Sequence, residues 1–93
     1  MDPKELYVGM TENPRNRWLS EAIGNSKKYC MVCYVGAVHS FASKKTETFF
    51  ITRVRNWCLD GMVRATCLNV ADGGERLGRR ANLWHCLYVC VNV

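Results

Sequence analysis

Hydrophobic side chains occupy every second position of residues 5–11. A period of two predicts a strand with one buried face. Asn13 and Pro14 follow and favour a helix start, because asparagine caps a free backbone N–H and proline suits the first helical position. Residues 14–23 then carry apolar side chains at helical spacing, and Gly24 is expected to end that helix.

Three further elements follow from the same kind of pattern. Residues 29–38 are almost entirely apolar, which predicts a strand buried on both faces at the centre of the sheet. Residues 44–58 carry a wide apolar stripe at helical spacing, with Ser43 as the expected N-cap. Alternation within residues 82–93 predicts a last strand. We therefore expect a single α/β (α+β) domain spanning residues 1–93, in which helices flank a short antiparallel sheet.

The composition is that of an ordinary folded domain with a basic surplus. Of the 93 residues, 48% are hydrophobic and 23% are charged, which argues against disorder. The 13 Lys and Arg outnumber the 8 Asp and Glu, so the net charge is +5 and the pI is near 9.0. This surplus favours an anionic partner, of which nucleic acid is the commonest.

Whether the cysteines form disulfides depends on the compartment in which the protein folds. No run approaches the roughly 18 apolar residues of a membrane helix, and the first residues form no secretory signal. An intracellular, reducing compartment, cytoplasmic or nuclear, is therefore expected, in which free thiols prevail over disulfides. Cys30 and Cys33 have the spacing of a zinc pair, but a strand would turn them to opposite faces. Buried core thiols are therefore favoured over structural zinc.

Basic residues near the first strand mark a candidate anion site. Tyr7 lies on that strand, and Arg15 and Arg17 fall in the first turn of the next helix, so a phenol and two guanidinium groups are expected near one another. The alternative is that both arginines are simply solvated. Further cations expected to contact phosphates are Lys27, Lys28, Arg76, Arg79 and Arg80.

Glu47 lies on the apolar stripe of the second helix, one turn before Phe50 and Ile51. A carboxylate on the inward face needs a partner, because burying an unpaired charge is costly. That partner would be a cation, an arginine such as Arg17, or a metal ion. Alternatively, Glu47 stays hydrated near the helix N-terminus, where the helix dipole favours a negative charge.

Taken together, these pieces resemble the GIY-YIG endonuclease superfamily. Residues 7–11, Tyr-Val-Gly-Met-Thr, are similar to the family's second-strand motif of tyrosine, aliphatic, glycine, any residue and threonine. Arg17 falls where the family has its catalytic arginine, and Glu47 falls where it has its metal-binding glutamate. Residues 67–75, which contain Asn69 and a double glycine, resemble a segment of phage-like members.

The resemblance implies a metal-dependent endonuclease that hydrolyses DNA. Glu47 would hold one Mg²⁺ or Mn²⁺. Arg17 would stabilise charge on the scissile phosphate, and Tyr7 would position or deprotonate the attacking water. Asn69 would help to shape the site. The family's first signature strand, glycine-aliphatic-tyrosine, has no counterpart at the start of this chain, so we expect residues 86–93, or a second copy in a homo-oligomer, to fill its place.

Two other functions remain open at this point. An inactive relative with the same fold would bind nucleic acid or a protein without cleaving it. A small zinc-bearing interaction module is the third possibility. Cleavage with a divalent cation, salt-dependent binding without cleavage, and the metal content of the purified protein distinguish the three.

Overall fold

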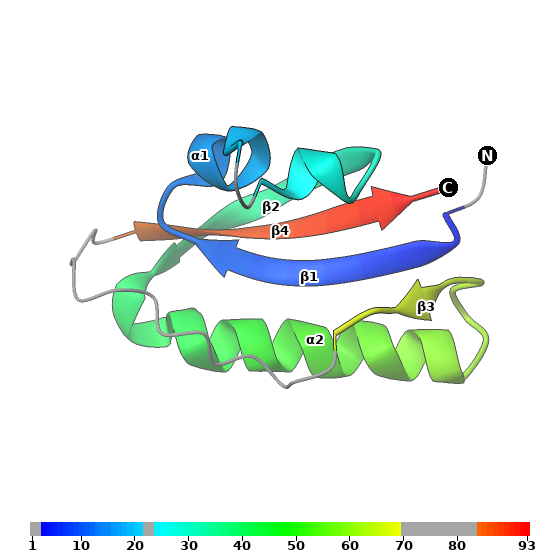
Figure 1. Ribbon diagram of the computed structural model, residues 1–93. Coiled ribbons are helices and arrows are strands. Elements are labelled where there is room, and N and C mark those ends of the chain that lie inside the picture. Colours follow the sequence, from blue (N-terminus) through cyan, green and yellow to red (C-terminus); the bar gives the residue numbers. More distant parts are fainter. Residues whose placement is uncertain (1–2, 22–23, 70–83) are drawn as a thin grey trace.

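The computed structural model describes residues 3–21, 24–69 and 84–93. Strands and helices alternate from β1 to β3, two short 3-10 turns, η1 and η2, lie among them, and a further strand, β4, ends the chain (Figure 1). In chain order the elements are β1 (Glu5–Thr11), α1 (Pro14–Leu19), η1 (Asn25–Lys27), β2 (Met31–His39), η2 (Ser40–Ala42), α2 (Ser43–Leu59), β3 (Thr66–Cys67) and β4 (Trp84–Asn92).

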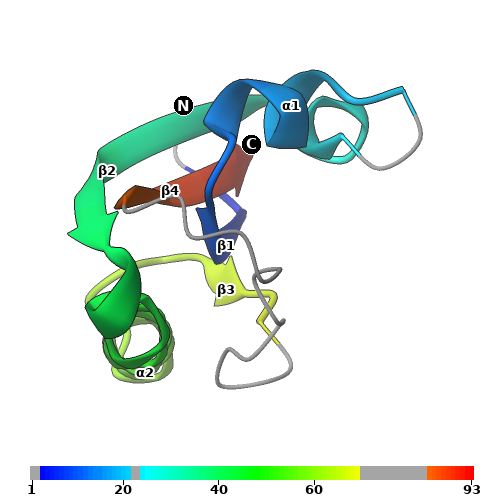
Figure 2. The same cartoon turned by 90° about the vertical axis from the view of Figure 1, so that its left-hand side faces the viewer.

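The strands form one mixed sheet in the order β2-β4-β1-β3. β4 runs antiparallel to both of its neighbours, whereas the short β3 runs parallel to β1. The two helices lie on opposite sides of this sheet, α1 on one face and α2 on the other (Figure 2). The predicted α+β class is confirmed, and the expected antiparallel pairing describes β2, β4 and β1 but not β3.

The core lies between the sheet and α2. Its members each expose less than one-tenth of their surface, and they are Val8, Met10, Ile51, Val54 and Leu87. The strand residues among them recur every second position, and the helix residues are three apart, so each element turns one apolar face to the other. Burial of apolar surface, at about 25 cal/mol per Å², holds α2 on this face of the sheet.

β4 is a central strand, and it pairs with the whole of β1, from Glu5 opposite Asn92 to Thr11 opposite Cys86. The expectation that the terminal segment lies beside the first strand is therefore confirmed. Just outside the strand, the Lys4 N–H donates to the Asn92 carbonyl at 2.7 Å. The first and last strands of the chain thus form the two arms of one antiparallel pair.

Among the described strands, β2 lies at the edge of the sheet, so the prediction that residues 29–38 form the central strand is wrong. Most of its side chains are exposed, including Met31, Tyr34 and Val35. The register with β4 shifts between Tyr34 and Gly36, which leaves Val35 as the extra residue of a bulge. β4 is central instead: it lies between β2 and β1 and has buried side chains on both of its faces.

The position of β2 also determines the exposure of the cysteines on and beside it. All six are free thiols. Cys30 and Cys33 are exposed on or beside the edge strand, so the prediction of core burial is wrong for this pair, whereas Cys90 on β4 is fully buried.

None of the helices described here is both long and apolar enough to cross a membrane.

α1 is shorter than the predicted helix over residues 14–23, because it ends at Leu19 and Ser20 already has an extended backbone. Gly24 therefore does not cap this helix. Its backbone is extended, and a β-carbon there would overlap the carbonyl oxygens of Ser20 and Trp18. Glycine is needed at this position for a close backbone approach and not for a left-handed turn.

α2 begins and ends close to the predicted residues. Ser43 lies inside the first turn and does not cap it, since its hydroxyl donates to the Ser40 carbonyl at 3.1 Å. At the other end Gly61 has the left-handed φ of +77°. The Met62 N–H then donates to the Trp57 carbonyl at 3.0 Å, which is the Schellman ending that glycine permits.

Candidate functional site

Four tyrosines, all that the chain contains, gather on the α1 side of the sheet, which we call the tyrosine face: Tyr7, Tyr29, Tyr34 and Tyr88. Tyr7 and Tyr88 alternate with core residues of β1 and β4, so the strand pleat turns them away from α2. Tyr34 lies opposite Tyr88 on β2, and Tyr29 stacks on Tyr7. Strand register and the stacking of Tyr29 on Tyr7 therefore place the four phenols on a common surface.

Tyr88 is the most deeply buried of the four, with 3% of its surface exposed. Its ring lies over Gly9 of β1, where any β-carbon would overlap the phenol. Asn25 Nδ2 donates to the Tyr88 hydroxyl at 3.2 Å. Burial raises the pKa of Tyr88, and neither the Asn25 hydrogen bond nor the nearby charge of Arg17 offsets this. The phenol therefore keeps its proton near neutral pH, so it is able to donate a hydrogen bond and cannot act as a base.

Tyr7 and Tyr29 stack with ring centroids 5.8 Å apart and planes inclined by 25°. Burial is the main cause that raises the pKa of Tyr29, and the neighbouring Tyr7 raises it further. Tyr7 acts in the same direction on the pKa of Tyr88. Tyr7 is thus within electrostatic reach of both Tyr29 and Tyr88.

α1 is fixed in place by the helix start that the sequence predicts. The Asn13 side chain accepts a first-turn N–H at 3.0 Å, and Pro14 occupies the first helical position. In a helix this short, Arg17 lies in the last turn, close enough for its charge to act on Tyr88. Arg15, on the same helix, is exposed to solvent. The structure therefore brings Arg17 to the tyrosine face.

Asn69 binds the backbone of β1 as a strand partner would. Its Oδ1 accepts the Val8 N–H at 2.8 Å, and its Nδ2 donates to the Val8 carbonyl at 2.8 Å. The preceding residue continues the pairing, since the Leu68 N–H donates to the Leu6 carbonyl at 2.8 Å. Arg55 in turn donates to the Asn69 carbonyl at 3.2 Å. Both ends of this amide are occupied in holding β1, the strand that carries Tyr7.

Glu47 lies half-buried in the second turn of α2, on the helix that covers the face opposite to the tyrosine face (Figure 2). The charges of Tyr7 and Arg17 both act on Tyr88, whereas α2, which carries Glu47, lies on the other face of the sheet. Within the described ranges, no group of three His, Cys, Asp or Glu residues could hold a metal ion. A single carboxylate such as Glu47 still suits Mg²⁺, which commonly keeps several waters and takes one or two protein carboxylates.

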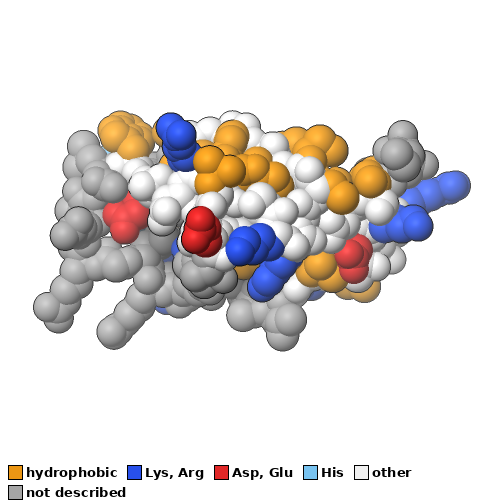
Figure 3. Space-filling view, turned by 45° about the horizontal axis from the view of Figure 1, so that its top comes forward, with side chains coloured by type: hydrophobic (Ala, Val, Ile, Leu, Met, Phe, Trp, Pro, Cys, Tyr) orange, Lys and Arg blue, Asp and Glu red, His pale blue; other side chains and the backbone are white. Residues whose placement is uncertain are grey.

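Basic side chains accompany the α1 side. Arg15, Lys27 and Lys28 are exposed there, and Lys27 Nζ donates to the Glu21 carbonyl. Figure 3 shows hydrophobic side chains gathered in a band on this side, with Lys and Arg side chains beside it. Three further predicted contacts lie outside the described residues, namely Arg76, Arg79 and Arg80.

Tyr88 is a site residue that the sequence pattern did not indicate, because the position is recognisable there only as part of an alternating last strand. The signal that would have found it is the pair Leu87-Tyr88, an aliphatic residue followed by tyrosine, in a strand expected beside Tyr7. Asn25 was also missed, because it lies in a turn segment whose fold only the structure shows.

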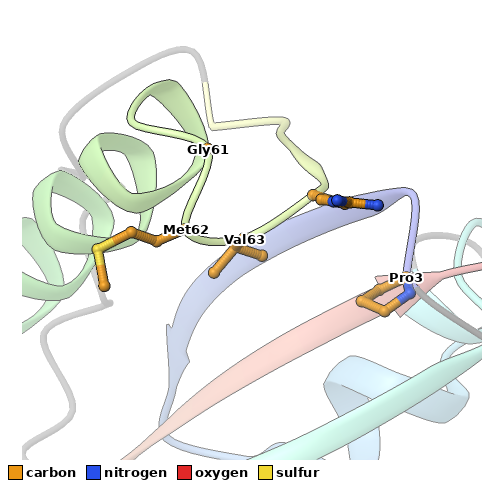
Figure 4. A pocket seen from close by; sticks show the side chains of 5 residues that line it. Pro3, Gly61, Met62 and Val63 are labelled. Atoms are coloured by element: carbon orange, nitrogen blue, oxygen red, sulfur yellow. The ribbon is translucent and has the colours of Figure 1, made fainter.

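A separate hollow lies where the loop after α2 passes the start of the chain (Figure 4). It is lined by Pro3, Gly61, Met62, Val63 and Arg64. The described residues of this lining offer one guanidinium group and no acid or nucleophile.

No known protein family, curated protein or solved structure matches the chain.

Proposed function

We propose that this chain is a metal-dependent endonuclease that hydrolyses DNA phosphodiester bonds. The observation that carries the proposal is the convergence of Tyr7, Tyr88 and the charge of Arg17 on one face. A protonated phenol and a guanidinium group both donate hydrogen bonds, and together they suit the oxygens of a phosphate. The net charge of +5 favours association with a polyanion.

The pairing of β4 with β1 supports the same proposal. The resemblance to the GIY-YIG superfamily implies a strand with glycine, aliphatic and tyrosine residues beside the strand that carries Tyr7. On β4, Leu87 and Tyr88 match the last two positions of that motif, and Cys86 stands where the family has glycine. β4 lies beside β1 in the sheet, but the order of the two strands along the chain differs from that of the family.

Each side chain then has its own task. Arg17 stabilises the charge that grows on the scissile phosphate, and Tyr88 donates a hydrogen bond to one of its oxygens. Tyr7, next to Tyr88, orients the attacking water. Glu47 would hold one Mg²⁺ or Mn²⁺, which supplies Lewis-acid chemistry when bound. Asn69 keeps β1 in register.

The proposal puts the scissile phosphate at the margin of the sheet beside β1. Among the described residues, β3 pairs with β1 only at Glu5 and Leu6, and Asn69 adds a contact at Val8. α1, which carries Arg17, and α2, which carries Glu47, lie on opposite faces of the sheet (Figure 2), so a bound strand has to pass an edge of the sheet to contact both.

Binding of nucleic acid without cleavage is the second candidate function. The observation that favours it is the position of Glu47 on the helix that packs against the opposite face. If the carboxylate does not reach the substrate, the tyrosine face and its cations still bind phosphates, but the metal contributes nothing.

Nicking of supercoiled plasmid with Mg²⁺ or Mn²⁺ tests the proposal. Arg17→Ala and Glu47→Ala should each lower the nicking rate about a hundredfold or more, as expected for loss of a group that stabilises transition-state charge. Arg64→Ala, which removes an exposed guanidinium elsewhere, should leave the rate unchanged. Equal rates in all variants would show that a contaminant cleaves. Salt-sensitive DNA binding with no cleavage in the parent protein would establish the second candidate.

A further inference from the structure

The outward surface of α2 carries an alternating row of basic and aromatic side chains. Lys45, Phe49, Arg53 and Trp57 follow one another at intervals of four residues, and we call them the helix ladder. Residues four apart on a helix are neighbours on one face. All four are exposed, with 55% of Phe49 and 40% of Trp57 open to solvent.

The central members of the helix ladder are ordered by contacts with one another. The Arg53 guanidinium carbon lies 5.3 Å from the centroid of the Phe49 ring and 6.0 Å from that of Trp57. Both distances are in the range of cation–π attraction. The two rings and the cation are therefore held in a defined arrangement before any partner binds, which lowers the entropic cost of binding.

A hollow lies along the same surface, and side chains that do not belong to the core line it. Phe49 and Arg53 border the hollow together with Thr48, Thr52 and Asn56. Two hydroxyls and an amide beside the aromatic rings provide hydrogen-bond donors and acceptors that are not specific to one base. The core face of α2 lies on the other side of the helix, so this surface can change without loss of packing.

The charge of the helix decides what kind of partner fits. Between Ser43 and Leu59, the chain carries four basic side chains and one acidic side chain. Exposed rings with cations between them match a strand whose bases are free to stack and whose phosphates are regularly spaced. A duplex keeps its bases stacked inside and cannot use the rings.

We propose that the helix ladder binds single-stranded nucleic acid, with bases on Phe49 and Trp57 and phosphates on Lys45 and Arg53. The helix that carries the ladder lies on the face of the sheet opposite to α1 (Figure 2). This inference does not rest on the proposed cleavage, because the ladder binds with no metal ion and no reaction.

Fluorescence anisotropy with a labelled oligo(dT) of about 12 nucleotides, in EDTA, tests the proposal. Phe49→Ala and Trp57→Ala should each raise the Kd about 5- to 100-fold, as found when a stacking ring is removed. The matched control is Phe41→Ala, which removes a ring that is 93% exposed but lies before the helix. It should leave the Kd within about a factor of two. Equal effects of Phe41→Ala and Phe49→Ala would overturn the proposal.

The salt dependence gives a second, independent measurement. Arg53→Gln should reduce the slope of log K against log salt by about 0.7, the value for one phosphate contact on a single strand, whereas Arg64→Gln should not. Dimerisation that requires Phe49 and Trp57, with oligo(dT) affinity unchanged in their variants, would identify a self-association surface and overturn the proposal. Tyr88→Phe should retain oligo(dT) binding, so failure of the cleavage proposal and failure of this one are distinguishable.

Discussion

The substitution Asn69→Ala tests whether the Asn69 side chain, in place of a neighbouring strand, stabilises β1 through its hydrogen bonds to Val8. The change removes two hydrogen bonds of 2.8 Å to the N–H and carbonyl of Val8, a residue that is 1% exposed. Each bond contributes about 1 kcal/mol net, and a buried backbone group left unpaired costs about 1–3 kcal/mol. The loss of unfolding free energy should therefore be about 2–4 kcal/mol.

Urea unfolding followed by tryptophan fluorescence measures this loss, and in a domain of this size it corresponds to a fall in Tm of roughly 10–25 °C. Asn56→Ala is the matched control, because Asn56 is exposed on α2, and it should change the unfolding free energy by less than about 0.5 kcal/mol. Asn69→Asp should also destabilise, since a carboxylate cannot donate to the Val8 carbonyl. A loss in Asn69→Ala no larger than that of the control would refute the reasoning.

Three further predictions concern the same sheet. Gly9→Ala should cost about 1–3 kcal/mol of unfolding free energy, because the added methyl overlaps the Tyr88 phenol; an unchanged urea midpoint would contradict this. Burial raises the pKa of Cys90 from 9.0 to about 11 and raises that of Tyr88 above 10.0, so the folded protein retains protons that the unfolded chain releases. Stability should therefore be fully present below about pH 9 and be lost as the pH rises through about 9 to 11, and Tyr88→Phe should lessen this loss in urea unfolding at about pH 8 and pH 10.5. His85 is 6% exposed, and neither ring nitrogen has a hydrogen-bond partner within the described structure. His85→Leu should therefore raise the unfolding free energy by about 1 kcal/mol, measured as a higher urea midpoint. A lowered midpoint would show that the imidazole is paired.

Local signals in the sequence predicted those parts of the fold that depend on local physics. β1 has its predicted bounds because alternation over residues 5–11 encodes which face is buried. The start of α1 follows from Asn13 and Pro14, since caps depend on a few neighbouring residues. These elements position Tyr7 and Arg17.

What the sequence did not predict depends on pairing between distant residues. Both β2 and β4 are apolar, and their composition alone does not say which is central; the register with β1 and the packing of α2 decide it. Tyr88 enters the site only through that register. Asn69 was predicted to shape the site, but its bonds to Val8 across 61 residues needed coordinates.

The most direct test of the central claim is single-turnover cleavage of end-labelled DNA by the parent protein and by Tyr88→Phe, with binding measured in parallel in EDTA. The account predicts a metal-dependent rate that falls about a hundredfold in Tyr88→Phe, because a hydrogen bond to the reacting phosphate is lost. The variant should still bind DNA and fold as the parent does. Cleavage that persists undiminished in Tyr88→Phe would contradict an active site on the tyrosine face.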